Sequence, residues 1–278
     1  MFAIDMKEAS ASAMPCAQRS ASRIYALTEP CGRESPFASC PFVREARVAP
    51  RRVNMGILMP ELTLYNYWRS SSSHRVRIAL ALKGLAYRYV AVNLLADEQS
   101  SADHKGRSPT GYVPCLVIDG VPYVESVAIL ELLDERFPSP PLYPKDAHAR
   151  ARVRALVEIV GSGIQPLQNR NVTQFLSPDV AVQHKWLQHF VTRGLAALEA
   201  AMESHEREGT RGKYAYGDAV TAADAFLVPQ VVSAQRFKID LAPFARVSGA
   251  FDEAMRLDAF VRAAPERQPD AVSKAQSV

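Results

Sequence analysis

The sequence predicts an α/β domain followed by an all-helical domain. Strand-like and helix-like segments alternate between residues 61 and 140, and this order favours a small sheet with helices on its faces. A proline-rich stretch ends the alternation, and the segments beyond it have helical periodicity without a competing strand pattern. A chain of 278 residues is long enough for two such domains.

The first domain, residues 61–140, is expected to have the order βαβ followed by ββα. Its first strand-like run ends in hydroxyl residues, and the helix-like run after it stops at Gly84. Asp119-Gly120 is a strong turn signal between two short apolar runs, which predicts a hairpin. In chain order we expect strand 62–67, helix 72–83, strand 86–92, a short helix within 96–110, strands 115–118 and 121–124, and helix 126–136.

The linker and the second domain follow. Four prolines between residues 138 and 144 mark the linker, and residues 146–270 form the predicted helical domain. Thr221 and Asp224 have the spacing of a capping box, which we assign to helix stability. The expected helices are 147–160, continuing past a break at Gly161 and Gly163 towards 175, then 179–205 and 221–235, and a shorter pair near 248–264.

Residues 1–60 differ in character from the rest of the chain. They are rich in Ala, Ser and Arg, contain repeated prolines and lack sustained periodicity, so we expect a disordered leader. Asp5 and Glu8 near the start argue against a transit peptide. Met55 and Met59 lie just before the first strand, and an over-extended start of translation is the preferred explanation of the leader.

Composition and charge exclude several classes of function. Of the net charge of +4, residues 1–60 contribute +3 (8 basic and 5 acidic residues), and the nearly neutral remainder gives no reason to expect a nucleic-acid partner. No apolar run reaches the roughly 18 residues that a membrane-spanning helix needs. Only Cys115 lies beyond residue 60, which argues against a disulfide framework and favours a reducing compartment, the cytoplasm.

A run of hydroxyl residues joins the first strand to the first helix. The segment from Ser70 to Arg75 follows the strand directly. There the first N–H groups of a helix have no intrahelical partner, and the helix dipole favours negative charge. The segment therefore predicts a pocket for an anion or a thiolate. The alternative is that one serine only caps the helix, and the residues alone leave both interpretations open.

Two further dipeptides are expected at the same edge of the sheet. Val113-Pro114 precedes the third strand, and a cis bond there would turn the backbone of Val113 outward to pair with an extended peptide. An ordinary trans proline at a strand start would have no such role. Glu125-Ser126 opens the next helix, where the hydroxyl can cap the helix or hold a carboxylate and Glu125 can pair with an ammonium group.

The helix-like segment 161–171 is unusual. Its glycines and Pro166 interrupt the periodicity, which explains a kink. A kink does not explain the amide side chains of Gln165 and Asn169, four residues apart on one helix face. Arg236 follows a long helical run, where a solvated arginine is the default interpretation. The chain has no zinc, calcium or phosphate-loop pattern and no Cys-x-x-Cys.

Taken together, these segments resemble the zeta class of glutathione transferases. The run from Leu64 to Leu80 and the run from Gly163 to Asn169 are highly specific in combination. The similarity extends over about residues 61–270. The shorter matching segments are 113–114, 125–126, 227–230, 236–241 and 268–270.

The resemblance implies a thioredoxin-like first domain, an all-helical second domain, glutathione as cofactor and a homodimer. It also implies the isomerisation of a small cis-diketo acid, maleylacetoacetate, to fumarylacetoacetate in tyrosine and phenylalanine breakdown, by reversible addition of the glutathione thiolate. The implied site residues are the catalytic Ser70, Ser71 and Ser72; the glutathione-binding Ser70, Ser71, Ser72, Ser73, His74, Arg75, Val113, Pro114, Glu125, Ser126, Gln165, Asn169, Arg170 and Asn171; and the substrate-binding Arg69 and Arg236, with no metal.

One departure from the family pattern concerns Ser72, where many members carry cysteine, so a role for a protein thiol is not expected. Bacterial maleylpyruvate isomerases of the same class are also similar but can carry His at the position of Gln165, which favours maleylacetoacetate. A broader glutathione transferase and a non-catalytic binding protein on the same fold are the other hypotheses. Consumption of glutathione would indicate the first, and failure to bind it would indicate the second.

Overall fold

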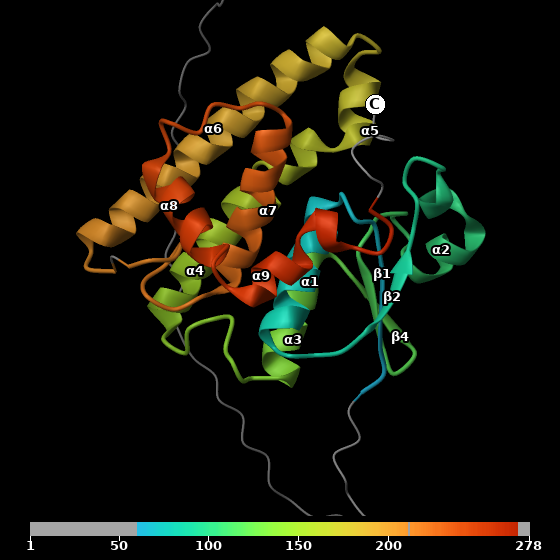
Figure 1. Ribbon diagram of the computed structural model, residues 1–278, viewed down its shortest axis with the longest axis horizontal. Helices are drawn as coiled ribbons and strands as arrows, with labels where there is room; N and C mark the ends of the chain where they lie inside the picture. Colours follow the sequence, from blue (N-terminus) through green and yellow to red (C-terminus); the bar gives the residue numbers. More distant parts are fainter. Residues whose placement is uncertain (1–59, 211, 272–278) are drawn as a thin grey trace, which may run out of the picture. The chain divides into compact units, whose positions relative to one another are not determined.

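The computed structural model describes residues 60–210 and 212–271. The leader expected for residues 1–60 lies outside the described residues except for Pro60. The described part contains a four-stranded sheet with helices on both sides and a further group of helices beside it (Figure 1). This arrangement confirms the predicted fold class, a thioredoxin-like α/β part followed by an all-helical part.

The strands of the sheet are β1 (Leu62–Asn66), β2 (Arg88–Ala91), β3 (Cys115–Ile118) and β4 (Val121–Val124), in the spatial order β2-β1-β3-β4. β1 and β2 are parallel, which requires a crossover connection, and helix α1 (Ser71–Leu82) supplies it. β3 runs antiparallel to both of its neighbours. Asp119 and Gly120 have positive φ angles of 51° and 84°, as the predicted hairpin turn requires.

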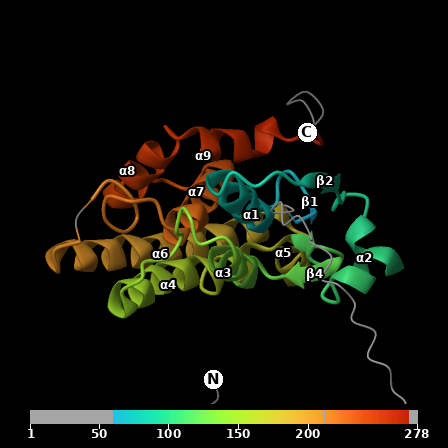
Figure 2. The same ribbon diagram turned by 90° about the horizontal axis from the view of Figure 1, so that it is seen from below.

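Helices lie on both sides of this sheet. α1 and α3 (Ser126–Arg136) lie on the side turned towards the helical group, whereas α2 (Ala102–Arg107) lies beyond the opposite side (Figures 1 and 2). Leu64 of β1 and Ile78 of α1 are fully buried in one continuous hydrophobic core that extends from the sheet into the helical group. The two parts therefore share apolar packing, which holds the sheet and the helical group together.

The helices of the second part are α4 (Ala147–Gly161), α5 (Arg170–Leu176), α6 (Val180–Arg207), α7 (Ala222–Arg236), α8 (Ala245–Ala254) and α9 (Asp258–Ala263). α7 is central and packs against α1, α4 and α8 (Figure 1). Every residue from Ala222 to Val231 is buried, which suits a helix enclosed on all sides. The capping box of Thr221 and Asp224 is present and starts this helix, as predicted.

Beyond the expected break at Gly161 and Gly163, the chain does not resume directly as an α-helix. α4 ends at Gly161, a short 3-10 turn, η2 (Gln165–Gln168), follows, and α5 begins at Arg170. A Cβ atom at Gly163 would lie 2.6 Å from the carbonyl oxygen of Ile159, so the chain turns where only glycine fits. Pro166 then removes a backbone donor that a continuous α-helix would need.

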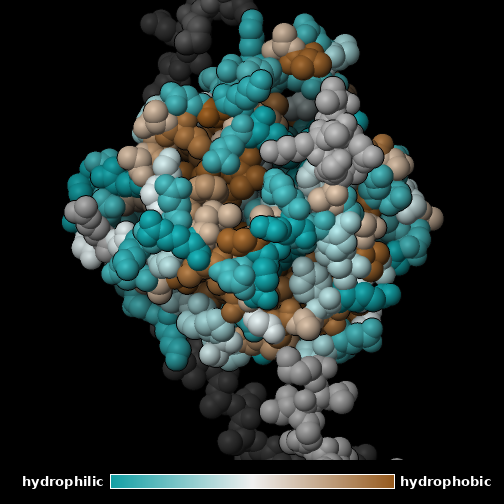
Figure 3. All heavy atoms as spheres, in the orientation of Figure 1, coloured by the Kyte–Doolittle hydropathy of each residue, from teal (hydrophilic) through white to brown (hydrophobic). Residues whose placement is uncertain are grey.

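The surface of the described part is mixed. Figure 3 shows hydrophilic residues over the outer parts of one face and hydrophobic residues mainly near its middle. None of the described helices combines the length and the apolar character that crossing a membrane requires. The described His, Cys, Asp and Glu residues do not form a group of three or more that could hold a metal ion.

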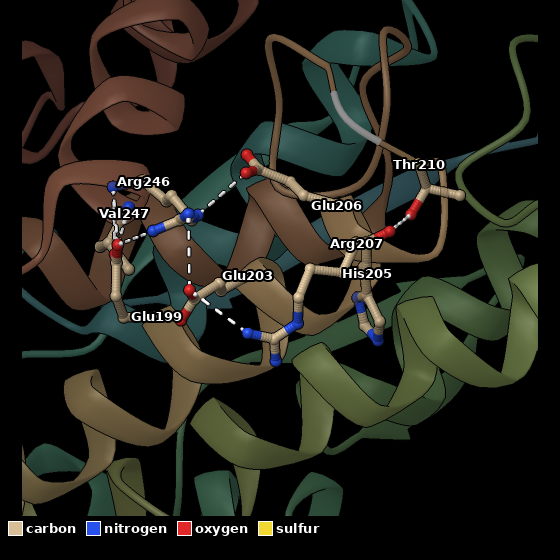
Figure 4. Close-up of polar contacts among 8 residues, drawn as sticks. All are labelled: Glu199, Glu203, His205, Glu206, Arg207, Thr210, Arg246 and Val247. Atoms are coloured by element: carbon tan, nitrogen blue, oxygen red, sulfur yellow. Dashed lines mark hydrogen bonds and ion pairs between the residues drawn. The ribbon is translucent and has the colours of Figure 1, made fainter.

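A carboxylate from α6 caps the start of α8. No residue of α8 provides a side-chain cap, and Glu199 instead accepts the backbone N–H groups of Arg246 and Val247, each at 3.0 Å (Figure 4). The guanidinium of Arg246 also contacts Glu199 at 3.2 Å and Glu206 at 3.0 Å. Because these donors would otherwise be unpaired, Glu199 fixes α8 on α6.

Replacing Glu199 should therefore destabilise the fold. We expect Glu199→Ala to lower the free energy of unfolding by about 1–2 kcal/mol, the usual cost of losing a helix cap. The measurement is urea denaturation. Arg207→Ala is the control, because it breaks an exposed ion pair with Glu203 on the same helix and should cost less than about 0.5 kcal/mol. Equal losses in the two variants would contradict the capping role.

Candidate functional site

A cleft of about 770 Å³ opens where the sheet meets the helical group. Its walls come from the loop between β1 and α1, the segment 94–114, the start of α3, and η2 with α5. The predicted site residues on its walls are Ser70, Ser72, Val113, Pro114, Glu125, Ser126, Gln165, Asn169, Arg170 and Asn171. A second hollow, of about 530 Å³, is formed by the α6 side chains between Lys185 and Arg193 alone and holds none of the predicted residues.

Ser70 is the N-cap of α1. Its backbone is extended, with φ −68° and ψ 118°, and its hydroxyl oxygen accepts the N–H of Ser73 at 3.1 Å. The expected helix-capping role of Ser70 is therefore confirmed. Capping uses a lone pair of the oxygen, so the hydroxyl hydrogen of Ser70 is still available to donate into the cleft. The N–H groups of Ser71 and Ser72 in the first turn have no intrahelical acceptor.

The structure does not bring the whole predicted segment to the cleft. Ser72 lies on the wall and Ser71 is half-buried away from it, whereas Ser73, His74 and Arg75 are buried inside the protein. Only one face of a helix can line a cleft, because successive residues point about 100° apart. Direct contact between a ligand and Ser73, His74 or Arg75, which the resemblance implied, does not follow from this geometry.

The other two predicted dipeptides do reach the cleft. The Val113-Pro114 peptide bond is cis, as the first interpretation expected. Among the described residues, neither the N–H nor the C=O of Val113 has a hydrogen-bond partner. Glu125 has a φ of 66°, in a region that costs a non-glycine residue energy, and its side chain does not cap α3. The carboxylate of Glu125 is exposed and thus remains available to a cationic group.

The amide residues after α4 form contacts across the mouth of the cleft. Gln165 donates to the side-chain oxygen of Asn169 at 2.7 Å, which accounts for their spacing. Asn171 donates to the Tyr112 hydroxyl at 2.9 Å, and Arg170 donates to the carbonyl of Leu94 at 3.4 Å. α5 is thereby tied to the segment on the opposite wall.

The two arginines predicted to bind substrate lie together beside the loop that carries Ser70. Arg236 donates to the backbone carbonyl of Arg69 at 3.4 Å. Desolvation by the surrounding protein and the nearby charge of Arg69 lower the pKa of Arg236 to about 10, although its side chain is partly exposed, so it stays charged at neutral pH. Neither arginine lies on the cleft wall itself.

The sequence did not reveal the role of two residues that hold this loop in place. Arg77 is buried and donates to the carbonyls of Trp68 and Ala263, both at 3.0 Å. Asp270 accepts the N–H of Trp68 at 3.2 Å and also the hydroxyl of Tyr89. The one available signal was that Arg77 lies within the apolar run of α1, where a solvated arginine would be out of place. Gln99 and Lys105 also line the cleft, and no pattern in the sequence indicated that they would.

The buried His74 should make the fold sensitive to acid. Burial and the nearby charges of Arg77 and Arg75 lower the pKa of His74 well below its usual value. Between that lowered pKa and about 6.5, the unfolded chain binds more protons than the folded chain, so stability falls as the pH decreases through this window.

His74→Phe should remove the contribution of His74 to the pH dependence of stability. We expect the free energy of unfolding of His74→Phe to vary less between about pH 5 and pH 7 than that of the wild type, measured by urea denaturation at each pH. His148→Ala is the control, because His148 is exposed on α4 and its loss should leave the wild-type pH dependence unchanged. An unchanged pH dependence in His74→Phe would contradict the assignment.

Known proteins match this chain over most of its described length. Residues 60–135 match the family described as "Glutathione S-transferase, N-terminal domain". Maleylacetoacetate isomerase of Mus musculus is 45% identical over 209 residues, which cover 74% of this chain and 94% of that protein.

Solved structures match as well. Maleylacetoacetate isomerase from Anaeromyxobacter dehalogenans 2CP-1 with GSH bound in its active site matches with 48% identity and a TM-score of 0.70, covering 77% of this chain and 99% of that one. The holo structure of a maleylpyruvate isomerase, described as a bacterial glutathione S-transferase in the zeta class, matches with 42% identity and a TM-score of 0.73, covering 76% and 100%. The chain therefore belongs to the zeta class of the glutathione S-transferase family.

Proposed function

We propose that this protein catalyses the glutathione-dependent cis–trans isomerisation of maleylacetoacetate to fumarylacetoacetate, a step in tyrosine and phenylalanine breakdown. The observation that carries the proposal is that Ser70, Ser126 and the pair Gln165 and Asn169 line a single cleft. Relatives of about 45% identity are named maleylacetoacetate isomerase, which agrees with this chemistry.

The cleft suits a tripeptide cofactor. Its volume of about 770 Å³ is within the range usual for small-molecule sites. The backbone N–H and C=O of Val113, which lack partners among the described residues, are a matching donor and acceptor for an extended peptide. We propose that Glu125 pairs with the ammonium group of glutathione, that Ser126 holds its adjacent carboxylate, and that residues 165–171 contact the rest.

The start of α1 would stabilise a thiolate. When bound, glutathione supplies a thiolate that adds reversibly to the double bond of the substrate and so permits rotation about it. We propose that the hydroxyl of Ser70 and the free amides of Ser71 and Ser72 donate to that sulfur. A free thiol has a pKa near 8.5, and lowering it by about 2 units corresponds to about 2.7 kcal/mol. Ser72 would act as a hydrogen-bonding residue, because it has no thiol to contribute.

The charged arginines would orient the substrate. We propose that Arg236, with Arg69 beside it, holds a substrate carboxylate and stabilises negative charge that develops on the neighbouring carbonyl oxygen. The 3.4 Å hydrogen bond from Arg236 to the carbonyl of Arg69 supports this role, because it keeps the guanidinium next to the residue that precedes Ser70. Arg170, which lies on the cleft wall, is a further cation near the proposed substrate position.

Two alternatives make different predictions. A maleylpyruvate isomerase is among the similar structures, and comparing turnover of maleylpyruvate and maleylacetoacetate distinguishes the two substrates. A general glutathione transferase would consume glutathione stoichiometrically, whereas an isomerase regenerates it. Unchanged glutathione after many turnovers supports the proposal.

Loss of the Ser70 hydroxyl should impair turnover. We expect Ser70→Ala to lower the rate of isomerisation by about 10²-fold or more, as when one donor to a developing anion is removed. The measurement is the absorbance change of maleylacetoacetate with and without glutathione.

The control for this variant must also lose a helix cap. Asp179→Ala removes the N-cap of α6, which accepts the N–H of Ala181 at 2.7 Å, outside the cleft. It should cost a similar stability, about 1 kcal/mol, without changing turnover. Turnover at the wild-type rate in folded Ser70→Ala would refute the role of Ser70.

We further propose a homodimer that acts in the cytoplasm, with a glutathione-binding domain at 61–140 and a substrate domain at 146–270. The support is the family resemblance and the near absence of cysteine after residue 60. Light scattering on the purified protein should give twice the mass of one chain. A monomeric mass would contradict the dimer.

A further inference from the structure

Arg75 is a buried cation that forms no ion pair with a carboxylate among the described residues. Only 2% of its surface is exposed, and its guanidinium lies 4.2 Å from the ring centroid of Phe226 on α7. Its one hydrogen bond is from Nη1 to the hydroxyl oxygen of Ser126, at 3.1 Å. Among the described residues, neither Nε nor Nη2 has a hydrogen-bond partner.

Such an arrangement costs stability. A buried charge that lacks an ion-pair partner and part of its hydrogen bonds destabilises the folded protein. Glu125 and Glu158 are near enough to favour the charge but are exposed and form no ion pair with it. Burial lowers the pKa of Arg75 to about 9, so the guanidinium is still charged at neutral pH.

The surroundings of Arg75 add further positive potential. Arg75 lies in the second turn of α1, near the positive end of that helix dipole. Ser126 is the first residue of α3, and Glu125 makes no side-chain cap there, so the first amides of α3 have no acceptor of their own. Two helix starts and a buried cation thus converge on Ser126, which lines the cleft.

The hydroxyl of Ser126 connects this potential to the cleft. Because its oxygen accepts a hydrogen bond from Arg75, its hydrogen is directed away from Arg75 and can donate to a ligand. A charged donor behind a hydroxyl polarises it and strengthens the bond that it donates.

We infer that Arg75 is a positioning residue that acts through Ser126 to select a ligand carboxylate at the start of α3. The inference rests on the proposed function and deepens it, because in glutathione this carboxylate is the α-carboxylate of the γ-glutamyl group. A bound carboxylate would supply the negative charge that Arg75 does not receive from an ion pair with any described residue. The ligand-free protein is therefore less stable than it would be without the buried charge, and carboxylate binding restores that stability.

A purely structural role for Arg75 makes different predictions. If Arg75 only joined α1, α3 and α7, replacing it would destabilise the free protein and weaken all ligands alike. If it acts through Ser126, Arg75→Met should leave the melting temperature of the free protein unchanged or raised, because a buried charge is replaced by an apolar side chain of similar length.

The experiment compares two probes by calorimetry: glutathione, and the analogue 4-aminobutyryl-cysteinyl-glycine, which lacks only that α-carboxylate. For Arg75→Met we expect affinity for glutathione to fall about tenfold or more and affinity for the analogue to change less than about twofold. In a Ser126→Ala background, Arg75→Met should cause less than about a twofold further loss.

Two other variants complete the design. Arg75→Lys retains the charge and should preserve most of the preference for glutathione over the analogue. Arg246→Met is the matched control, because it removes an arginine from the network between α6 and α8 and should leave both affinities unchanged.

The outcomes separate the inference from the proposed function. Equal losses for both probes, or a melting temperature of Arg75→Met well below that of the wild type, would overturn the inference alone. Failure of Arg75→Met to fold would overturn it as well. If the wild-type protein does not bind glutathione, the proposed function fails, and this inference fails with it.

Discussion

The geometry of the cleft depends on the hydrogen bonds of one buried guanidinium, that of Arg77. It donates to the side chain of Asn66 at the end of β1, to the carbonyl of Trp68 in the following loop, and to the carbonyl of Ala263 in α9. The sheet, the loop that carries Ser70 and the last helix are therefore held at one point. Leaving any of these buried carbonyls unpaired would be costly, so the three elements are fixed relative to one another.

α1 serves two purposes because of its periodicity. The cleft-facing side of its first turn presents Ser70 and Ser72, while residues from Ser73 to Leu80 are buried against the sheet, α3 and α7. The buried side includes polar groups without partners among the described residues, on Ser73, His74 and Arg75. Polar groups of this kind usually weaken a core. In α1 the polar groups of Ser73, His74 and Arg75 lie within the first two turns, where the positive potential of the helix start favours an anionic ligand.

Much of the fold was predictable because its signals are local. Hydrophobic periodicity indicated the strands and most helices, and Asp119-Gly120 and Thr221 with Asp224 specified a turn and a cap within a few residues. The break at Gly161 and Gly163 was expected, but the 3-10 turn that follows it was not, because the geometry there depends on the close approach of the Ile159 carbonyl oxygen to Gly163.

The candidate site was predictable only in part. The cleft contains Ser70, Val113, Glu125 and Ser126, which were linked by their expected positions at one edge of the sheet. Ser73, His74 and Arg75 were assigned by resemblance to a continuous segment, although a helix turns such a segment away from any single surface. Arg77 and Asp270 were missed because their partners are up to 202 residues away in the chain.

The contacts of Ala263 and Asp270 have a consequence for biosynthesis. Ala263 lies 186 residues after its partner Arg77, and Asp270 lies 202 residues after its partner Trp68. During synthesis, the sheet and α1 leave the ribosomal exit tunnel long before Ala263 and Asp270 have been added to the chain. Until residues 263 and 270 have been added to the chain, the loop that carries Ser70 lacks these two hydrogen-bonded contacts.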